Sequence, residues 1–257
     1  MNRRFVVLLS RPPPTCRCEF HIDDLPGSGR FDHIARCVNA ALLLSNGTRR
    51  DTELILVFGR HDEASEEVWV IRIHGDEVRH IRPDERSTAW ILLTALHPKP
   101  CTPAMTTKRT REAPVTQTLP KVCVSLAEQH SESSSIYDGG AHKCCKGVTC
   151  TLWPSLRSVL ADCAAEACGG LLHQLSLEAT LQAESAISLL AGAVGPMTFV
   201  LGDDRGFTEE AQVALEATGA ARPVALGSDM LLTSHAIVFL HCLMLNAHSR
   251  DRPAAVH

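Results

Sequence analysis

The sequence lacks the basic excess and the aromatic residues that mark a broad nucleic-acid-binding surface. Across 257 residues the formal net charge is −4, and aromatic residues make up only 4% of the chain. Proteins that hold nucleic acid over a large surface are usually basic, because they must neutralise phosphates. Any contact with RNA must therefore be local, and the chain has few rings on which bases can stack.

Long hydrophobic runs are also absent. The stretch "MNRRFVVLLSRPPP" has five apolar residues, 5–9, between its two arginines and Ser10. This run is too short for the apolar region of a signal peptide, and no other run reaches membrane-spanning length. We expect a buried first strand and a cytoplasmic protein without membrane contact, with a nuclear or organellar location left open.

Cysteine is plentiful, but its spacing does not suit a zinc or disulfide framework. The eleven cysteines include no CxxC pair, and an odd number leaves at least one unpaired. One metal ion has candidate ligands in His142, Cys144, Cys145 and Cys150, but no second pair follows at zinc-ligand spacing. Free intracellular thiols are the simpler interpretation, and no metal is expected.

Residues 1–97 are rich in arginine. They contain 13 arginines and no lysine, against 14 acidic residues. The planar guanidinium suits phosphate contacts, so a local RNA-facing patch is one interpretation. A solvated surface of paired ions is the commoner explanation for such a balance.

The hydrophobic pattern alternates strands with helices, which predicts an α/β domain with a mostly parallel sheet. Asn46-Gly47 is expected to end the first helix. Thr208 can cap a later helix, with Glu209 and Glu210 in its first turn. The predicted strands are 5–9, 52–59, 68–75, a short one in "VTCTLW" before residue 155, 197–201 and 222–227. The predicted helices are 33–45, 84–96, 155–167, one from residue 208, and 231–245.

Residues 98–145 interrupt this alternation. They are rich in Pro, Ser, Thr and Gly and show little periodicity, which predicts a flexible insertion. The expected organisation is therefore one domain over 1–250, interrupted by 98–145 and followed by a tail at 251–257.

Two predicted strands end in glycine turns, Leu201-Gly202 and Leu226-Gly227. In a parallel sheet both turns lie at the same edge, where ligands bind. Neither GxGxxG nor GxxxxGK[ST] is present, and Asp203-Asp204 would repel a pyrophosphate. A cationic adenosyl cofactor fits better, although such a turn can also serve only to change the direction of the chain.

Four segments in order strengthen the cofactor interpretation: "DLPGSGRFDHIARCVNAALLLSNGTRRDTELILVFG", "IRPDERSTAWILLTAL", "FVLGDDRGFTEE" and "LGSDMLLTSHAIVFLH". Together they resemble the TrmY family, the tRNA pseudouridine-54 N1-methyltransferases of the SPOUT superfamily. The resemblance covers most of 1–97 and about 146–245. It implies an α/β fold with a C-terminal trefoil knot, a homodimer, tRNA as partner and S-adenosylmethionine as cofactor.

The resemblance also implies which residues hold the cofactor. This chain has Ala236 where family members usually have a cysteine, and Asp204 where the common "LGDH" has histidine. Leu181 matches only by ungapped counting back from Gly202. The implied cofactor contacts are Leu181, Leu201, Gly202, Leu226, Gly227, Ser228, Asp229, Met230, Leu231 and Ala236.

The implied acceptor is N1 of pseudouridine, which carries a proton because the base is joined to ribose through carbon. A carboxylate is a natural base for that proton, and Asp32 is the first candidate, followed by Asp84. Asp84 can equally be only a helix N-cap. Arg30, Arg36 and Arg86 are candidates for RNA contact, with salt bridges as the alternative. His235 is a candidate for contact with the cofactor or with RNA, and a helix-start hydrogen bond is its alternative.

The predicted activity is S-adenosylmethionine-dependent methylation of pseudouridine N1 in the T loop of tRNA. An rRNA pseudouridine methyltransferase and an inactive RNA-binding or assembly protein with the same fold are the alternatives.

Overall fold

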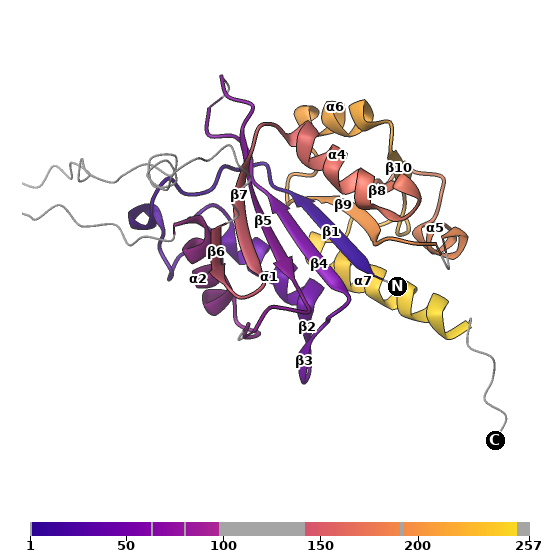
Figure 1. Cartoon of the computed structure of the whole chain (residues 1–257), viewed down its shortest axis with the longest axis horizontal. Coiled ribbons are helices and arrows are strands. Elements are labelled where there is room, and N and C mark those ends of the chain that lie inside the picture. The colour runs from indigo at the N-terminus through magenta and orange to yellow at the C-terminus, as the bar shows by residue number, and fades with distance from the viewer. Residues whose placement is uncertain (1, 63, 80, 98–141, 191–192, 251–257) are drawn as a thin grey trace, which may run out of the picture.

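The computed structural model describes residues 2–62, 64–79, 81–97, 142–190 and 193–250. Its strands form one eight-stranded sheet and a separate two-stranded hairpin, and helices cover the large sheet (Figure 1). The strands are β1 (Arg3–Leu8), β2 (Leu43–Leu44), β3 (Gly47–Thr48), β4 (Thr52–Val57), β5 (Val68–His74), β6 (His142–Cys145), β7 (Val148–Trp153), β8 (Leu172–Leu175), β9 (Met197–Gly202) and β10 (Ala221–Val224). The helices are α1 (Phe31–Leu42), α2 (Glu85–Leu96), α4 (Leu156–Glu166), α5 (Ala183–Leu189), α6 (Glu209–Thr218) and α7 (Thr233–Arg250), with 3-10 turns η1 (Arg17–Glu19) and η3 (Cys168–Gly170).

The large sheet has the strand order β10-β8-β9-β1-β4-β5-β7-β6. The first five strands run parallel to their neighbours, and β5, β7 and β6 continue the sheet in antiparallel pairs. In the centre, Val6 of β1 lies opposite Ile55 of β4 and Val200 of β9. The predicted α/β class with a mostly parallel sheet flanked by helices is therefore confirmed.

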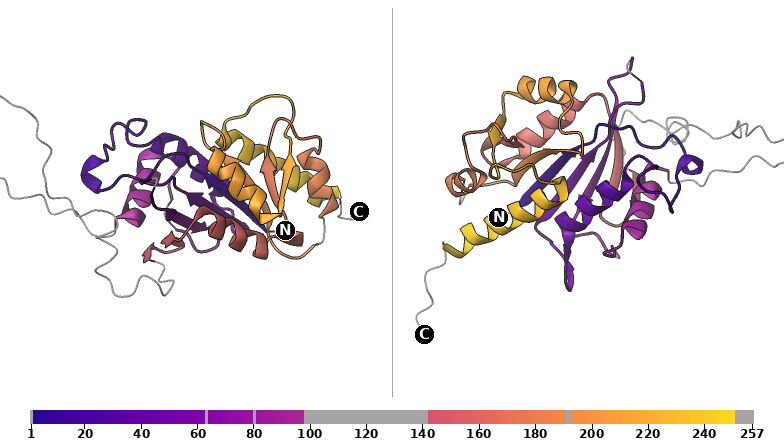
Figure 2. Two further views of the ribbon diagram at one scale, coloured as in Figure 1. Left: turned by 90° about the horizontal axis from the view of Figure 1, so that it is seen from above. Right: turned by 180° about the vertical axis from the view of Figure 1, so that it is seen from behind.

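Side chains of the central strands point alternately to the two faces of the sheet, and each face has its own hydrophobic core. Phe5 and Val7 face the first core, which α1, α2, α5 and α7 complete. Val6 and Leu8 face the second, which α4 and α6 complete. Seen from behind, α7 and α1 lie side by side across the first face (Figure 2). Each fully buried aliphatic side chain contributes roughly 1.5–3 kcal/mol, so aliphatic packing holds both layers without many aromatic rings.

The structure corrects several predicted elements. Asn46-Gly47 does not cap the first helix, because α1 ends at Leu42 and the chain turns through the β2–β3 hairpin. The sequence pattern missed β8 and α5, which lie in the alanine-rich stretch before β9. Residues 142–145 were expected in the insertion but form β6. The rest of that insertion lies outside the described residues.

Strands from both sides of the insertion pair in one sheet. Strand β5 pairs with β7, and β1 pairs with β9. Among the described residues, no helix is long and apolar enough to cross a membrane. The trefoil knot implied by the resemblance stays a prediction.

Candidate active site

A cavity of about 660 Å³ opens at the carboxyl ends of β8, β9 and β10. This volume is within the usual range for a small-molecule site. Three segments and five single residues line it: 174–178, 201–207, 229–233, and His33, Gln212, Val224, Leu226 and Ala236. The predicted position of the site, at the edge where parallel strands end, agrees with this cavity.

The turn after β9 requires glycine at its start. A Cβ on Gly202 would lie only 2.5 Å from the carbonyl carbon of Gly206, so a larger residue would push the turn open. The carbonyl oxygen of Gly202 accepts a hydrogen bond from Oγ1 of Thr233 at 2.7 Å. Gly202 thereby joins the end of β9 to the first residue of α7, and both lie on the cavity wall.

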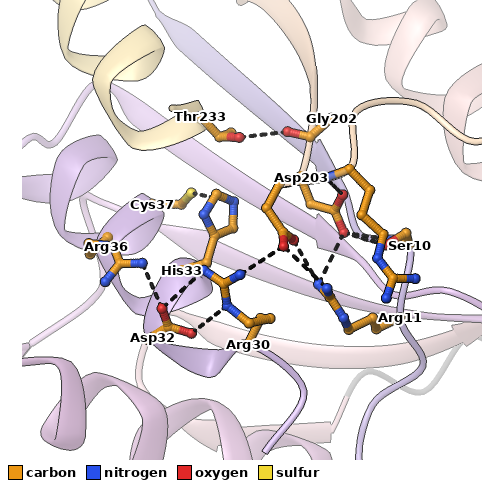
Figure 3. A network of polar contacts seen from close by, with 12 residues as sticks. Ser10, Arg11, Arg30, Asp32, His33, Arg36, Cys37, Gly202, Asp203 and Thr233 are labelled. Carbon is orange, nitrogen blue, oxygen red and sulfur yellow. Dashed lines mark hydrogen bonds and ion pairs between the residues drawn. The ribbon is translucent and has the colours of Figure 1, made fainter. Parts of the chain in front are cut away.

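The two aspartates of this turn hold three elements together (Figure 3). Asp203 accepts hydrogen bonds from the backbone N–H and the hydroxyl of Ser10, both at 2.7 Å, and from the N–H of Arg205 at 2.8 Å. Asp204 accepts from Arg11 at 2.7 Å and from Arg30 at 2.8 Å. The hydrogen bond from Arg11 lowers the pKa of Asp204. The aspartates therefore join the end of β1 and the start of α1 to β9.

Arg30 precedes α1 in the left-handed conformation, with φ of 62°, which is uncommon for a residue with a side chain. Asp32 accepts from Arg30 at 3.0 Å and from Arg36 at 2.7 Å, and Arg36 also contacts Glu85 at 3.0 Å. Burial opposes ionisation of Asp32, but the hydrogen bonds from Arg30 and Arg36 lower its pKa to about 2. The structure therefore makes Asp32 the anchor of two arginines and a weak proton acceptor.

Asp84 is not among the residues that line the cavity. It is the N-cap of α2, where its Oδ1 accepts from the backbone N–H of Ser87 at 2.7 Å. That hydrogen bond lowers the pKa of Asp84. Arg86 is 66% exposed and pairs with Asp23 at 2.9 Å. The structure therefore confirms the alternative given for Asp84, the N-cap of its helix.

Seven of the ten predicted cofactor residues line the cavity: Leu201, Gly202, Leu226, Asp229, Met230, Leu231 and Ala236. Gly227 and Ser228 belong to the same loop, and Gly227 has φ of 117°, where a side chain would be strained. Leu181 packs against the core, and its carbonyl accepts the N–H of Ala225. Neither Leu181 nor the pair 227–228 is part of the cavity lining.

Sequence reasoning missed three parts of the lining: residues 174–178, Gln212 and His33. Residues 174–178 follow β8, a strand that the pattern did not predict. Gln174 donates through its amide to Gln212 of α6 at 2.7 Å, which closes one side of the cavity. His33 comes from α1, where its place on a buried helix face resembles that of an ordinary core residue. Recognising β8 would have revealed the first of these parts.

Metal ligation has no support among the described residues, which contain no group of three or more His, Cys, Asp or Glu side chains able to hold an ion. The side chains of His142, Cys144 and Cys145 lie outside the described part, and Cys150 is buried in β7. The expectation that the chain needs no metal stays a prediction.

A solved structure matches the fold over nearly the whole chain, at low sequence identity. The structure of Archaeoglobus fulgidus Nep1 bound to S-adenosylhomocysteine has a TM-score of 0.50 and 11% identity, and the match covers 97% of this chain and all of that chain. At this identity the likeness bears on the fold alone. It confirms the α/β fold, a mostly parallel sheet flanked by helices.

Sequence comparison identifies the family. Residues 2–137 match the family of SAM-dependent RNA methyltransferases. The tRNA (pseudouridine(54)-N(1))-methyltransferase of Halobacterium salinarum is 33% identical over 240 residues, which cover 93% of this chain and 94% of the relative. The enzyme of the same name from Methanocella arvoryzae is 31% identical over 93% of this chain and 96% of its own. The chain belongs to this methyltransferase family.

The cavity suits S-adenosylmethionine, the cofactor of the family. Leu201, Leu226 and Ala236 are apolar residues of the lining, which would suit the adenine and ribose carbons. Glu178 and Asp229 supply carboxylates, which favour the cationic sulfonium and amino groups. The residues present therefore fit this cofactor.

Proposed function

We propose that this chain transfers a methyl group from S-adenosylmethionine to N1 of pseudouridine at position 54 of tRNA. The cavity at the ends of β8, β9 and β10 is the observation that carries the proposal, because its walls coincide with most of the residues expected to hold the cofactor. Relatives that bear this activity in their names match 93% of the chain, which supports the same substrate.

The methyl group of a sulfonium is already activated, so the protein mainly has to align donor and acceptor and accept one proton. Gly202 and the loop 226–231 hold the cofactor in this proposal, with Ala236 as part of the apolar wall. Gly227 and Ser228 shape that loop through their backbone. Leu181 supports it from behind through its hydrogen bond to Ala225.

Arg30 and Arg36 hold RNA phosphate or the uracil carbonyls beside the cavity, and Arg86 extends this surface along α2. All three are paired with carboxylates in the structure. A phosphate must therefore compete with those carboxylates, which keeps the surface neutral until RNA binds. His235, exposed on α7, lies near the cavity-lining Ala236 and completes the set of RNA candidates.

Isothermal titration calorimetry with S-adenosylmethionine tests the cofactor site first, and absence of binding by the purified protein would overturn the enzyme assignment. Methyl transfer is then measured on two tRNA transcripts that differ only in pseudouridine or uridine at position 54. We expect a methylated product only from the pseudouridine transcript. Transfer to neither transcript, by protein that binds the cofactor, would favour a non-catalytic RNA-binding role.

Nucleoside mass spectrometry of cells that lack the protein tests the choice between tRNA and rRNA. We expect N1-methylpseudouridine to disappear from tRNA and to persist in rRNA. The opposite result would reassign the enzyme to rRNA.

We further propose a homodimer in the cytoplasm and a single knotted domain over 1–250, with the insertion ending before residue 142 and a tail at 251–257. Pairing of β5 with β7 across the insertion supports the single domain. Exposed apolar side chains on α7, among them Val238, Phe239 and Leu245, support the dimer. An intact dimer by sedimentation equilibrium is the expected result.

A further inference from the structure

The proposed reaction leaves one proton without an acceptor. N1 of pseudouridine carries a hydrogen that must leave when the N1–methyl bond forms. Asp32 has both carboxylate oxygens engaged by arginines, and Asp84 caps α2 away from the cavity lining. If the proposed function holds, another residue of the cavity must accept this proton.

His33 projects from the first turn of α1 and lines the cofactor cavity, although the residue is only 2% exposed. It also lines a small recess formed by Arg11, Arg30, Asp203 and Asp204. Figure 3 shows the imidazole beside Cys37, with the turn of Asp203 on its other side and the contact between Gly202 and Thr233 above it. His33 is the only histidine among the cavity-lining residues that the structure describes.

The surroundings of His33 leave one ring nitrogen able to accept a proton. Nε2 lies 3.8 Å from Sγ of Cys37, and Nδ1 has no hydrogen-bond partner among the described residues. Burial raises the pKa of Cys37 to about 12, so the sulfur stays a thiol. In the tautomer with Nε2–H directed at this sulfur, Nδ1 holds the lone pair that can accept a proton. Burial also lowers the pKa of His33. The negative charges of Asp204 and Asp203 oppose this shift, and the positive charges of Arg30 and Arg36 add to it. The imidazole is therefore neutral at physiological pH.

The neighbouring aspartates are poor alternatives for this role. Asp203 receives three hydrogen bonds, two from Ser10 and one from Arg205. Asp204 is engaged by two guanidinium groups, those of Arg11 and Arg30. Both carboxylates are better placed to stabilise a positive charge on His33 than to accept a proton themselves.

We propose that His33 is the catalytic base of the methyl transfer. The lone pair of N1 forms the bond to the methyl carbon, the sulfur–methyl bond breaks, and its electron pair remains on sulfur. The N1 proton passes to the free ring nitrogen of His33. The resulting imidazolium lies beside Asp203 and Asp204, whose negative charge stabilises it until the proton is released to water.

The test compares wild type with His33→Asn and His33→Ala on the pseudouridine-54 transcript. Removal of a general base typically costs about 10²–10⁴-fold, so we expect kcat to fall at least about 100-fold. S-adenosylmethionine affinity, measured by calorimetry, should change little. Added imidazole should restore part of the rate of His33→Ala, because the deleted ring leaves space beside the cavity. His173→Asn is the matched control, since His173 is also buried but is not part of the cavity lining.

Two further readouts separate a base from a packing residue. The wild-type rate should fall at acidic pH as His33 becomes protonated. This acidic fall should be absent from the residual rate of His33→Ala measured without added imidazole. In NMR spectra of ¹³C-labelled histidines, the resonance missing from His33→Asn should titrate below the ordinary histidine range. If wild type is active and His33→Asn is equally active, the proposed role of His33 is wrong, while the proposed function of the protein still stands. An inactive wild type would instead overturn the proposed function.

Discussion

Nη1 of Arg3 lies 3.1 Å from Nδ1 of His241, so β1 and α7 meet through a buried pair separated by 238 positions. The other ring nitrogen, Nε2, lies 3.0 Å from the carbonyl oxygen of Ala41 in α1. Arginine only donates and a carbonyl only accepts, so Nδ1 must be the acceptor and Nε2 the donor. The imidazole of His241 is therefore neutral and joins β1, α1 and α7.

Stability should fall with acidity because of this histidine. Burial, with help from Arg49 and Arg3, lowers the pKa of His241 to about 3 from its usual 6.5. Above pH 6.5 neither state carries the proton, and the full stability is present. As pH falls further, the unfolded chain binds a proton that the folded chain refuses, at up to about 1.4 kcal/mol per pH unit.

We expect the His241→Gln variant to lose this part of the pH dependence between pH 6.5 and about 3. Urea unfolding at several pH values measures it, with His235→Gln, an exposed residue of the same helix, as the control. Equal pH slopes for wild type and His241→Gln would contradict the neutral, buried imidazole.

The Asp32→Asn variant separates an arginine anchor from a catalytic base. The folded-state pKa of Asp32 is lowered, so its stabilising effect is present above pH 4 and lost as pH falls toward about 2. At neutral pH we expect a loss of roughly 1–2 kcal/mol in unfolding free energy, discounted because both arginines are partly exposed. Methylation should weaken mainly through a higher KM for tRNA, because Arg30 and Arg36 lose their shared acceptor.

A very different kinetic result would restore Asp32 as the base. In that case kcat would fall by about 100-fold or more while KM for tRNA stayed constant. Asp84→Asn serves as the comparison, because this exposed cap does not line the cavity. Its KM for tRNA should match that of wild type.

The fold was largely predictable because hydrophobic runs mark buried strands directly. Strands β1, β4 and β9 are buried almost throughout, which is typical of the centre of a parallel sheet. Strand β8 was missed because "LHQL" mixes polar and apolar residues. Its polar side chains are buried by specific contacts, as when His173 reaches the carbonyl of Thr198, and no periodicity encodes such contacts.

The site was predictable where backbone geometry demands particular residues. Gly202 and Gly227 mark turns that a side chain would clash with or strain. Asp32 binds arginines that are near in sequence, whereas Asp204 binds Arg11 and Arg30, which lie 193 and 174 positions away. Local sequence cannot show that Arg30 sits between them, so a carboxylate that anchors arginines resembles a free base.

The turn after β9 should not tolerate a side chain at its first position. In Gly202→Ala the new methyl group would meet the Gly206 backbone at 2.5 Å, in a turn that Thr233 also holds. Overpacking of this kind typically costs about 1–3 kcal/mol. We expect a lower melting temperature and weaker binding of S-adenosylmethionine by calorimetry.

Gly206→Ala is the matched control for this clash. A Cβ there meets no atom within 4 Å, although φ of 80° imposes strain of about 1 kcal/mol. It should therefore lose stability but retain cofactor affinity better than Gly202→Ala. Unchanged cofactor binding in Gly202→Ala would show that the turn can move without disturbing the cavity.

The outer face of α7 carries exposed apolar side chains. Val238, Phe239 and Leu245 are 45%, 44% and 52% exposed, and Cys242 between them is also exposed. Their spacing places them along one stripe of the helix, which is unusual for a surface that stays in water. In a twofold dimer each side chain is buried twice, so we expect Phe239→Glu to raise the dimer dissociation constant by about 100-fold or more.

Sedimentation equilibrium measures this change, and Val213→Glu is the matched control. Val213 is 60% exposed on α6, which covers the opposite face of the sheet. We expect wild type and Val213→Glu to remain dimers at concentrations where Phe239→Glu is a monomer. A dimeric Phe239→Glu would move the interface to another surface, whereas a monomeric wild type would remove the dimer altogether. Because α7 also begins at the cavity wall, S-adenosylmethionine affinity of the monomeric variant shows whether dimerisation supports the site.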